Sequence, residues 1–411
     1  MFERNLAPQL LEALADTPVV ALTGARQTGK STLAQQIAAR IEAGYWTLDD
    51  AATHAAAASD PVGFIRGLGR AAVIDEAQKA PGLFAALKAE VDRDRRPGRF
   101  LLTGSADVRT LPAISESLAG RIEFATLWPL SQGEIHGRRE RFIDALFARE
   151  LPRLGRSPAG ERSIEAMVAA GGYPEALARA VESRREAWFS SYIATLLQRD
   201  VRDLARIDGL TELPRLLRLL AARSAALLNA SEISRSSGIA NTTLKRYLAL
   251  LELVFLVRPL AAWSTNLGKR LVKSPKLHLV DSGLAAHLLG LSAQRLAQDR
   301  HALGALLESF VVGELRKQAA WAETRVSLGH FRSPAGAEVD VVLEDRRGRV
   351  AGVEVKASAS VGRRDFSGLL LLQQSLRARF ACGVVLYTGE QAVPFGDRLI
   401  ALPVSALWRV A

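Results

Sequence analysis

One stretch of eight residues constrains this chain more than any other: "GARQTGKS", residues 24–31. It fits the pattern G-x-x-x-x-G-K-[ST] at every fixed position. The apolar run "VVALT" precedes it and a helix-favouring run follows it. We therefore expect a buried strand at 19–23, a Gly-rich turn, and a helix from about 30 to 41.

The residue types in this loop suit a phosphate group. Gly24 and Gly29 let the backbone curl so that its N–H groups face an anion, Lys30 can reach terminal phosphates, and Ser31 can bind Mg²⁺. A chance glycine turn before a helix is the alternative interpretation. The pattern predicts an ATP-binding loop with Mg²⁺, formed by Gly24, Ala25, Arg26, Gln27, Thr28, Gly29, Lys30, Ser31 and Thr32.

Two further apolar runs end in polar residues. "AAVIDEAQ" places Asp75 and Glu76 at the end of a predicted strand at 71–74, beside the loop. Asp75 is expected to hold Mg²⁺ through water, and Glu76 to orient the attacking water. "FLLTGS" ends in Thr103 and Ser105, which could sense the terminal phosphate. A strand-end turn of small polar residues is the alternative for this last pair.

Arg121, in "SLAGRIEF", lies in a polar turn before a β-like run. An arginine there could act as a finger on the nucleotide of a neighbouring subunit. That role predicts a homo-oligomer, such as a hexameric ring or at least a dimer. An ordinary surface arginine is the alternative.

The order of periodic segments indicates an α/β protein. Strands alternate with helices up to about residue 138, which predicts a parallel sheet with helices on both faces. A helical region follows, and "NASEISRSSGIANTTLKRYLALLELVFLVRPL" reads as a helix, a turn at Gly238, a second helix at 242–253 and a strand, the order of a winged helix-turn-helix. From about residue 266 a second α/β domain closes the chain.

Composition narrows the partners and the compartment. The 411 residues carry a net charge of +11, which favours a polyanion such as DNA, although Arg-rich usage can also reflect genome composition. Cys382 is the only cysteine, so no internal disulfide can form and a reducing cytoplasm fits best. No apolar run approaches the roughly 18 residues that a membrane span needs.

The segment "EVDVVLEDRRGRVAGVEVKAS", residues 338–358, predicts a hairpin that turns at Gly348. Centred there, Asp340 faces Glu354. Alternation then assigns two faces to the hairpin, an acidic one and an apolar one: Glu338, Asp340, Glu354 and Lys356 on the first, and Val339, Val341, Val353 and Val355 on the second.

Facing carboxylates repel one another unless a cation or a proton neutralises them. We therefore expect Asp340 and Glu354 to bind Mg²⁺ or Mn²⁺, with Lys356 steering water or stabilising charge on a phosphate. Glu308, near the edge of the apolar stripe of "LGALLESFVVGELRK", could reach the same site. An exposed hairpin face with cross-strand ion pairs is the alternative.

Several motifs together resemble one family, the bacterial and archaeal AAA-type ATPases with a C-terminal DUF4143 domain. They are "GARQTGKSTL", "IDEAQK", "LLTGSA", "LAGRIEFATLWPLSQGEI", "GGYPEAL", "YIATLLQRDV", "KSPKLHLVDSGLAAHLLG", "LLESFVVGEL", "GAEVDVVL" and "GVEVKAS". The resemblance runs from Gly24 to Ser358.

The resemblance implies an AAA-like core (1–138), a helical lid (139–222), a winged helix (223–264) and a DUF4143 domain similar to PD-(D/E)xK nucleases (265–411). It implies that Lys30, Ser31, Asp75 and Glu76 form the ATP site. It also implies that Glu308, Asp340, Glu354 and Lys356 match the nuclease-like positions, with Val339 where the motif's name has a Pro.

Two functions remain open on these grounds. The first is an ATPase that acts on DNA by remodelling, branch migration or translocation, with cleavage by the C-terminal domain undecided. The second is a regulatory ATP switch that binds a protein partner through its winged helix and C-terminal domain, because Lys245 and Arg246 make only a sparse basic face on the second helix.

Overall fold

The structure is a computed structural model that describes residues 2–106, 118–148, 154, 162–201, 212–266, 268, 270 and 273–410, without the side chains of 199–201. Apart from the first two residues, it divides into two compact units. The first contains Glu3–Leu130 with Leu251–Phe255, and the second contains Ser131–Leu250 with Leu256–Ala411. Within the described residues, no helix combines the length and the apolar character needed to cross a bilayer.

The first unit is built on a parallel sheet, as the alternating strands and helices predict. Its strands run in the order β2 (Gly44–Thr47), β3 (Ala72–Asp75), β4 (Phe100–Gly104), β1 (Val19–Thr23) and β5 (Ile122–Thr126). Every pairing between them is parallel. The carboxyl ends of all five strands therefore meet at one edge, which is where such sheets bind ligands.

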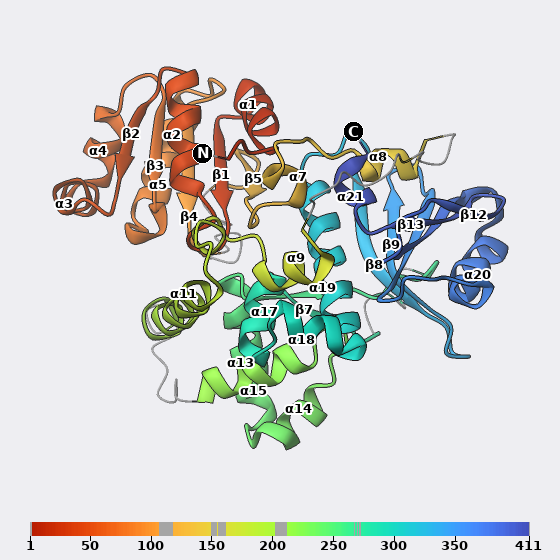
Figure 1. Cartoon of the computed structure of the whole chain (residues 1–411). Coiled ribbons are helices and arrows are strands. Elements are labelled where there is room, and N and C mark those ends of the chain that lie inside the picture. Colours follow the sequence, from red (N-terminus) through yellow and green to blue (C-terminus); the bar gives the residue numbers. More distant parts are fainter. Residues whose placement is uncertain are drawn as a thin grey trace. The chain divides into compact units, whose positions relative to one another are not determined.

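Helices cover both faces of this sheet (Figure 1). They are α1 (Ala7–Asp16), α2 (Lys30–Arg40), α3 (Ala51–Ser59), α4 (Pro61–Gly67) and α5 (Leu83–Arg93), with a short 3₁₀ turn at Ala77–Lys79. Phe84 and Leu87 of α5 pack with Ile74 and Leu102 in one fully buried cluster. Each such side chain contributes about 1.5–3 kcal/mol by leaving water, so the strand ends that carry the site rest on a rigid core.

The second unit begins with helices. They are α7 (Gln132–Ile135), α8 (Phe142–Leu146), α9 (Ile164–Ala170), α10 (Pro174–Leu177), α11 (Glu182–Thr195) with a π-helical turn at Leu196–Val201, α13 (Leu213–Ala222), α14 (Ala230–Ser237) and α15 (Asn241–Leu253). α14 ends at Gly238, which has a φ of 76°, the left-handed conformation that glycine adopts without strain. The predicted helix–turn–helix segment is thus formed by α14 and α15.

A short antiparallel sheet follows α15. β6 (Val257–Leu260) pairs with β7 (Lys276–Leu279), and Leu227 forms a further antiparallel bridge to Lys276. The strand-like runs "VFLVRPL" and "KLHLVD" therefore lie side by side, although 15 residues separate β6 from β7 in the sequence.

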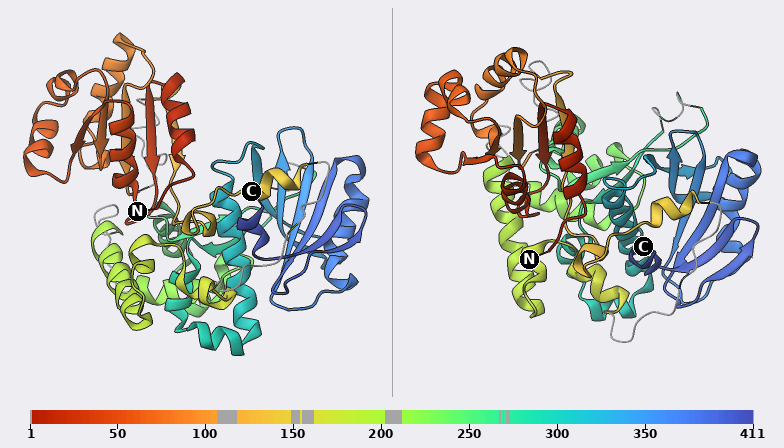
Figure 2. Two further views of the ribbon diagram at one scale, coloured as in Figure 1. Left: turned by 45° about the horizontal axis from the view of Figure 1, so that its top comes forward. Right: turned by 90° about the horizontal axis from the view of Figure 1, so that it is seen from above.

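The C-terminal sheet has six strands in the order β12 (Val393–Gly396), β13 (Leu399–Pro403), β11 (Phe380–Tyr387), β10 (Val350–Lys356), β9 (Glu338–Asp345) and β8 (Val326–Arg332). It is mixed, since β10, β11 and β13 pair in parallel and the other neighbours pair antiparallel. Figure 2 draws its strands in blue. The remaining helices are α17 (Ser282–Leu289), α18 (Ala293–Gln298), α19 (Arg300–Gln318), α20 (Ser367–Leu376) and α21 (Ala406–Arg409).

The predicted hairpin is formed by β9 and β10. Gly348 has a φ of 75°, as the turn requires, and Val353 pairs with Val341, one step from the expected Glu354 and Asp340 pair. The predicted apolar face is wrong in one respect: Val339 packs with Val342 in the cluster under α20. The register of β8 against β9 shifts at this point, and such a bulge interrupts the alternation of side chains.

Candidate functional site

The phosphate-binding loop leaves the end of β1 with a glycine that no other residue can replace. Gly24 has a φ of +154°, and a Cβ atom there would lie 2.2 Å from the carbonyl oxygen of Leu127. Gly29 has a φ of +92° and directly precedes α2. The loop is therefore curled onto the first turn of a helix of 11 residues, where free N–H groups favour an anion.

Lys30 lies across this loop. Its Nζ donates hydrogen bonds to the carbonyl oxygens of Gly24 (2.9 Å) and Ala25 (2.8 Å), and the side chain is buried. A phosphate group in the loop can accept these hydrogens in place of the carbonyls, and its charge makes it the stronger acceptor. The ammonium group of Lys30 is therefore already positioned at the loop where the phosphate is expected to bind.

Arg4 also holds the phosphate-binding loop in place. Nothing in the sequence indicated this contact. Its guanidinium donates to the carbonyl oxygens of Thr28 (2.6 Å) and Trp128 (2.7 Å), and the side chain is buried. Thr28 also closes the loop on itself, because its Oγ1 donates to the carbonyl oxygen of Ala25 (2.9 Å). The loop is thus held in its curled form by side chains as well as by its glycines.

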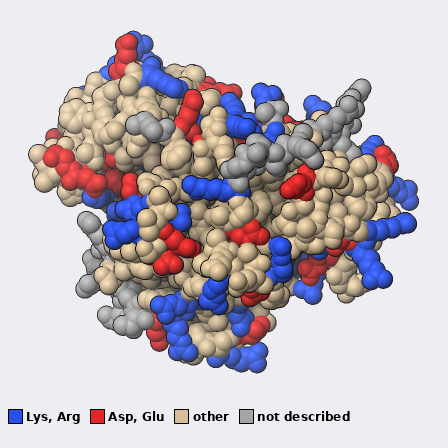
Figure 3. Space-filling model, in the orientation of Figure 1, with Lys and Arg blue, Asp and Glu red and all other residues tan. Residues whose placement is uncertain are grey.

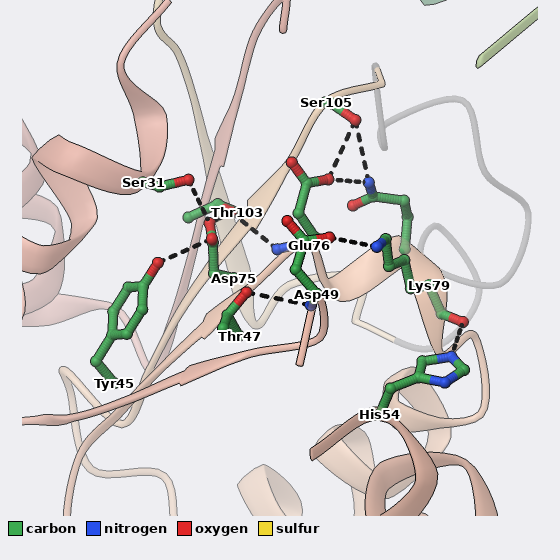
Figure 4. Close-up of polar contacts among 11 residues, drawn as sticks. Ser31, Tyr45, Thr47, Asp49, His54, Asp75, Glu76, Lys79, Thr103 and Ser105 are labelled. Carbon is green, nitrogen blue, oxygen red and sulfur yellow. Dashed lines mark hydrogen bonds and ion pairs between the residues drawn. The ribbon is translucent and has the colours of Figure 1, made fainter. Parts of the chain in front are cut away.

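Asp75 gathers three hydroxyl groups at the carboxyl edge of the sheet (Figure 4). Its Oδ1 accepts from Ser31 Oγ at 3.2 Å and from Thr103, and its Oδ2 accepts from Tyr45 at 2.8 Å. Burial and this hydrogen bond to Asp75 raise the pKa of Tyr45 above its usual value. A buried carboxylate beside a serine hydroxyl provides the hard oxygen donors that Mg²⁺ prefers, so the residues present fit the expected ion.

Glu76 stands next to this cluster in an uncommon backbone conformation, with a φ of 57°. Its N–H donates to Thr103 Oγ1 at 3.1 Å, and its carboxylate accepts from Ser105 at 3.1 Å and from Gln78. A left-handed conformation outside glycine costs on the order of 1 kcal/mol and persists where the surrounding contacts hold it. Thr103 and Ser105, expected near the terminal phosphate, thus contact the two acidic residues directly.

A second group of contacts lies beside Glu76 in Figure 4. Lys79 forms an ion pair with Asp49, and its carbonyl oxygen lies 3.2 Å from a ring nitrogen of His54. Thr47 Oγ1 accepts from the N–H of Asp49 at 3.2 Å. These contacts fix the ends of β2 and β3 relative to each other.

Arg121 is not part of the nucleotide site of its own chain. It directly precedes β5, where its carbonyl oxygen accepts from Val19 N, so it lies at the amino edge of the sheet, away from the loop. Its guanidinium donates to Asp92 at 2.6 Å, which holds the pKa of Asp92 below its usual value. A role for Arg121 in a neighbouring subunit stays a prediction.

The C-terminal acidic residues are held by a lysine that the sequence did not single out. Lys276 Nζ donates to Glu308 Oε1 at 2.8 Å and to Asp340 Oδ1 at 2.9 Å. The second oxygen of Asp340 accepts from Val355 N at 3.0 Å. Burial and the charge of Asp340 raise the pKa of Glu308 to about 8.

The other residues of the expected acidic face form separate pairs. Lys356 Nζ donates to Glu354 Oε1 at 2.8 Å, and Glu338 pairs with Arg332 at 2.9 Å. Burial and the charge of Asp340 raise the pKa of Glu354 to about 7. The residues expected to share one face are therefore divided between several ion pairs.

Three buried carboxylates, to which the sequence assigned no role, accept hydrogen bonds from backbone N–H groups. Glu314, in "LLESFVVGEL", accepts from Gln132 N at 2.9 Å, and Glu140 accepts from Gly133 N at 2.7 Å. Asp281, in "LVDSGLA", accepts from Gly172 N of "GGYP" at 2.7 Å. These carboxylates satisfy N–H groups at helix starts and turns, so these contacts are structural.

Comparison with known protein families agrees with this arrangement. The family described as "AAA domain" matches residues 16–136, "Domain of unknown function (DUF8612)" matches 161–295, and "Domain of unknown function (DUF4143)" matches 303–407. Two proteins described as uncharacterised, Rv2008c of Mycobacterium tuberculosis and Mb2031c of Mycobacterium bovis, are each 35% identical over 405 residues. The match covers 97% of this chain and 83% of each relative.

The chain belongs to the P-loop AAA ATPases with a C-terminal DUF4143 domain. A solved member of the wider P-loop class, described as the Walker-type ATPase paby2304 of Pyrococcus abyssi, is similar over 70% of this chain and 96% of that one, with 16% identity and a TM-score of 0.42. The family matches and the two mycobacterial relatives confirm the resemblance inferred from the motifs.

Proposed function

We propose that this AAA–DUF4143 protein binds ATP with Mg²⁺, hydrolyses it, and uses the energy to act on DNA. The observation that carries the proposal is the convergence of Ser31, Asp75, Thr103 and Glu76 at the edge of the sheet next to the loop.

Each residue has a role in that reaction. The loop N–H groups and Lys30 bind the phosphates, and Ser31 and Asp75 would hold Mg²⁺, which offsets the negative charge that develops on the phosphates. Glu76 orients the attacking water, and Thr103 fixes both Asp75 and the backbone of Glu76. Ser105 and Gln78 hold the Glu76 carboxylate, so its approach to water requires these hydrogen bonds to be exchanged.

DNA is the polyanion we favour as the partner. The net charge is +11, and α14 and α15 form a helix–turn–helix followed by the β6–β7 sheet, the element order of a winged helix. Arg235, Lys245 and Arg246 are exposed on these two helices. In Figure 3, Lys and Arg side chains are interspersed with Asp and Glu over the visible face. Because a helix–turn–helix presents its second helix to the major groove, α14 and α15 are the surface to test first.

The experiment measures the ATP turnover rate against a panel of linear, branched and single-stranded DNA at low salt. We expect at least one DNA structure to stimulate turnover, with the stimulation falling as salt rises because phosphate contacts release counterions. The double variant Lys245→Ala/Arg246→Ala should weaken the stimulation without changing the basal rate. No response to any DNA structure at low salt would end the DNA half of the proposal.

The second candidate is a regulatory ATP switch that binds a protein partner. It is supported by the mixed signs of the charges in Figure 3, because a protein partner presents both signs whereas DNA presents phosphates alone. DNA affinity that is absent, or that does not change with salt, would support the switch. Basal ATP turnover is expected under both candidates, so DNA affinity separates them.

The proposed function includes a homo-oligomer, in which Arg121 acts on a neighbouring subunit, and a cytoplasmic location. If Arg121 completes the site of a neighbouring subunit, ATP turnover per chain should rise with protein concentration, and Arg121→Ala should remove that rise. A fully active monomer would exclude this role. A chain with a single cysteine, Cys382, forms no internal disulfide, which suits a reducing cytoplasm.

A further inference from the structure

The nuclease-like resemblance of the C-terminal domain implies a divalent metal ion on Asp340 and Glu354, so the first question is which oxygens remain for one. Both carboxylate oxygens of Asp340 are occupied: Oδ1 accepts from Lys276 at 2.9 Å and Oδ2 accepts from Val355 N at 3.0 Å. Glu308 Oε1 accepts from the same ammonium group at 2.8 Å. Both oxygens of Asp340 and one oxygen of Glu308 are therefore already hydrogen-bonded within the chain.

The positive charge of Lys276 also disfavours a metal ion at Asp340. The Lys276 side chain is only 7% exposed, so its ammonium cannot turn out to solvent. A divalent ion bound to Asp340 Oδ1 would lie beside this buried positive charge, in an environment where like charges repel strongly. Two carboxylates that would otherwise repel each other are instead neutralised from within the chain.

Glu354 keeps a buried oxygen without a hydrogen-bond partner, and Oε2 of Glu308 takes no part in the ion pair with Lys276. In Glu354 the oxygen without a partner is Oε2, whereas Oε1 accepts from Lys356. Mg²⁺ usually takes one or two protein carboxylates and keeps several waters, so what stands against it here is the buried ammonium of Lys276 rather than the number of remaining oxygens. Across the described ranges, no group of three or more His, Cys, Asp or Glu side chains is arranged to hold a metal ion.

We infer that Lys276 is the resident cation of the C-terminal acidic site, and that this domain therefore does not bind a catalytic metal or cleave DNA by metal-dependent chemistry. This replaces the expectation that Asp340 and Glu354 are metal ligands. The backbone of Lys276 pairs with β6 and with Leu227, while its side chain reaches α19 and β9. The ion pair thus fastens the β6–β7 sheet to the domain that resembles a nuclease.

The test uses Mn²⁺ as a probe, counted by electron paramagnetic resonance in the full chain without nucleotide. Wild type, Asp340→Asn, Lys276→Ala and the double variant share an identical nucleotide site, so differences among them report on the C-terminal site alone. We expect wild type and Asp340→Asn to bind equally. Lys276→Ala should gain one Mn²⁺ ion, and the double variant should lose it again.

Two results would overturn the inference. One is a lower Mn²⁺ count in Asp340→Asn than in wild type, and the other is a Lys276 variant that folds but gains no ion. If Lys276→Ala does not fold, Lys276→Met keeps most of the side-chain volume and carries no charge. ATP turnover of each sample is measured in parallel, so loss of the proposed ATPase function would be recognised separately.

A second readout does not depend on any Lys276 variant. Supercoiled plasmid is incubated with wild type or Asp340→Asn in the presence of Mn²⁺, and the nicked fraction is compared. The inference expects the two proteins to give the same background. Nicking that is present in wild type and at least tenfold lower in Asp340→Asn would contradict it.

Discussion

Ser31 Oγ donates a hydrogen bond to Asp75 Oδ1 at 3.2 Å, although the two residues are 44 positions apart. Ser31 comes from the first turn of α2 and Asp75 from the last position of β3. Parallel strands bring the carboxyl end of β3 next to the loop that follows β1. This contact joins the phosphate-binding half of the nucleotide site to its acidic half.

Gly24→Ala should abolish ATP binding. A Cβ atom at this position would lie 2.2 Å from Leu127 O, and its φ of +154° is unfavourable for any other residue, so the loop must shift. We expect a loss of about 2 kcal/mol or more in the free energy of unfolding, measured by urea denaturation, together with loss of binding of a fluorescent ATP analogue.

Gly67→Ala is the matched control, because a Cβ atom there meets nothing within 4 Å. It should leave the affinity for ATP unchanged. Normal affinity in Gly24→Ala would show that the loop tolerates a different backbone path.

Arg4→Ala should weaken ATP binding more than catalysis. The guanidinium holds the carbonyls of Thr28 and Trp128, and without it the loop loses its support and two buried acceptors lose their donors. We expect the KM for ATP to rise about tenfold, equivalent to about 1.4 kcal/mol, with kcat changed less. Arg66→Ala, an exposed arginine on α4, should change neither constant, and a fall in kcat alone would contradict the account.

Thr103→Val should reduce kcat with little change in KM. Valine keeps the shape of threonine but removes the hydroxyl that donates to Asp75 and accepts from Glu76 N. Leaving these groups unpaired costs about 1–3 kcal/mol, which corresponds to a roughly 10- to 100-fold loss if it falls on the transition state. Thr103→Ser, which restores the hydroxyl, should recover most of the rate; equal losses in both variants would point to packing instead.

Glu140 should make the second unit less stable as pH rises from about 5 to 7. Burial and the neighbouring Glu314 raise the pKa of Glu140 from 4.5 to about 7. Between these two values the folded state binds more protons than the unfolded state, so the free energy of unfolding falls with pH, by at most about 3 kcal/mol from this group.

Glu140→Gln should flatten that slope, as seen from urea midpoints at pH 5 and pH 7.5. The variant–wild type difference isolates Glu140, since the raised pKa values of Glu308 and Glu354 act on both proteins alike. Glu390→Gln, an exposed position, serves as the control. Parallel slopes for wild type and Glu140→Gln would contradict the prediction.

Local pattern predicted the nucleotide site better than the C-terminal site, for a physical reason. The loop, Asp75 and Thr103 all follow buried strands, and apolar runs with a polar end are visible in a single sequence. No apolar run with a polar end marks Tyr45, Arg4 or Gln78 in the sequence. Tyr45 lies on the edge strand β2, where exposed and half-buried residues alternate, and Arg4 reaches Trp128 across 124 positions.

Lys276 was missed because its partners come from different elements. It lies 64 positions from Asp340, and nothing in "KSPKLHLVD" indicates that its ammonium enters an acidic site. The hairpin register was predicted correctly from the turn at Gly348, whereas the bulge at Val339 was not, because a bulge depends on the neighbouring strand β8. The expected hairpin faces failed at this bulge.

The most direct test of the central claim compares Glu76→Gln with wild type in Mg²⁺-dependent ATP binding and turnover. Glutamine keeps the size of the side chain and one acceptor oxygen for Ser105 and Gln78, but it cannot accept a proton from water. The account predicts that Glu76→Gln binds ATP with wild-type affinity and turns it over at least about 100-fold more slowly. Turnover within a few-fold of wild type would contradict the assignment of Glu76 and of this strand edge as the hydrolytic site.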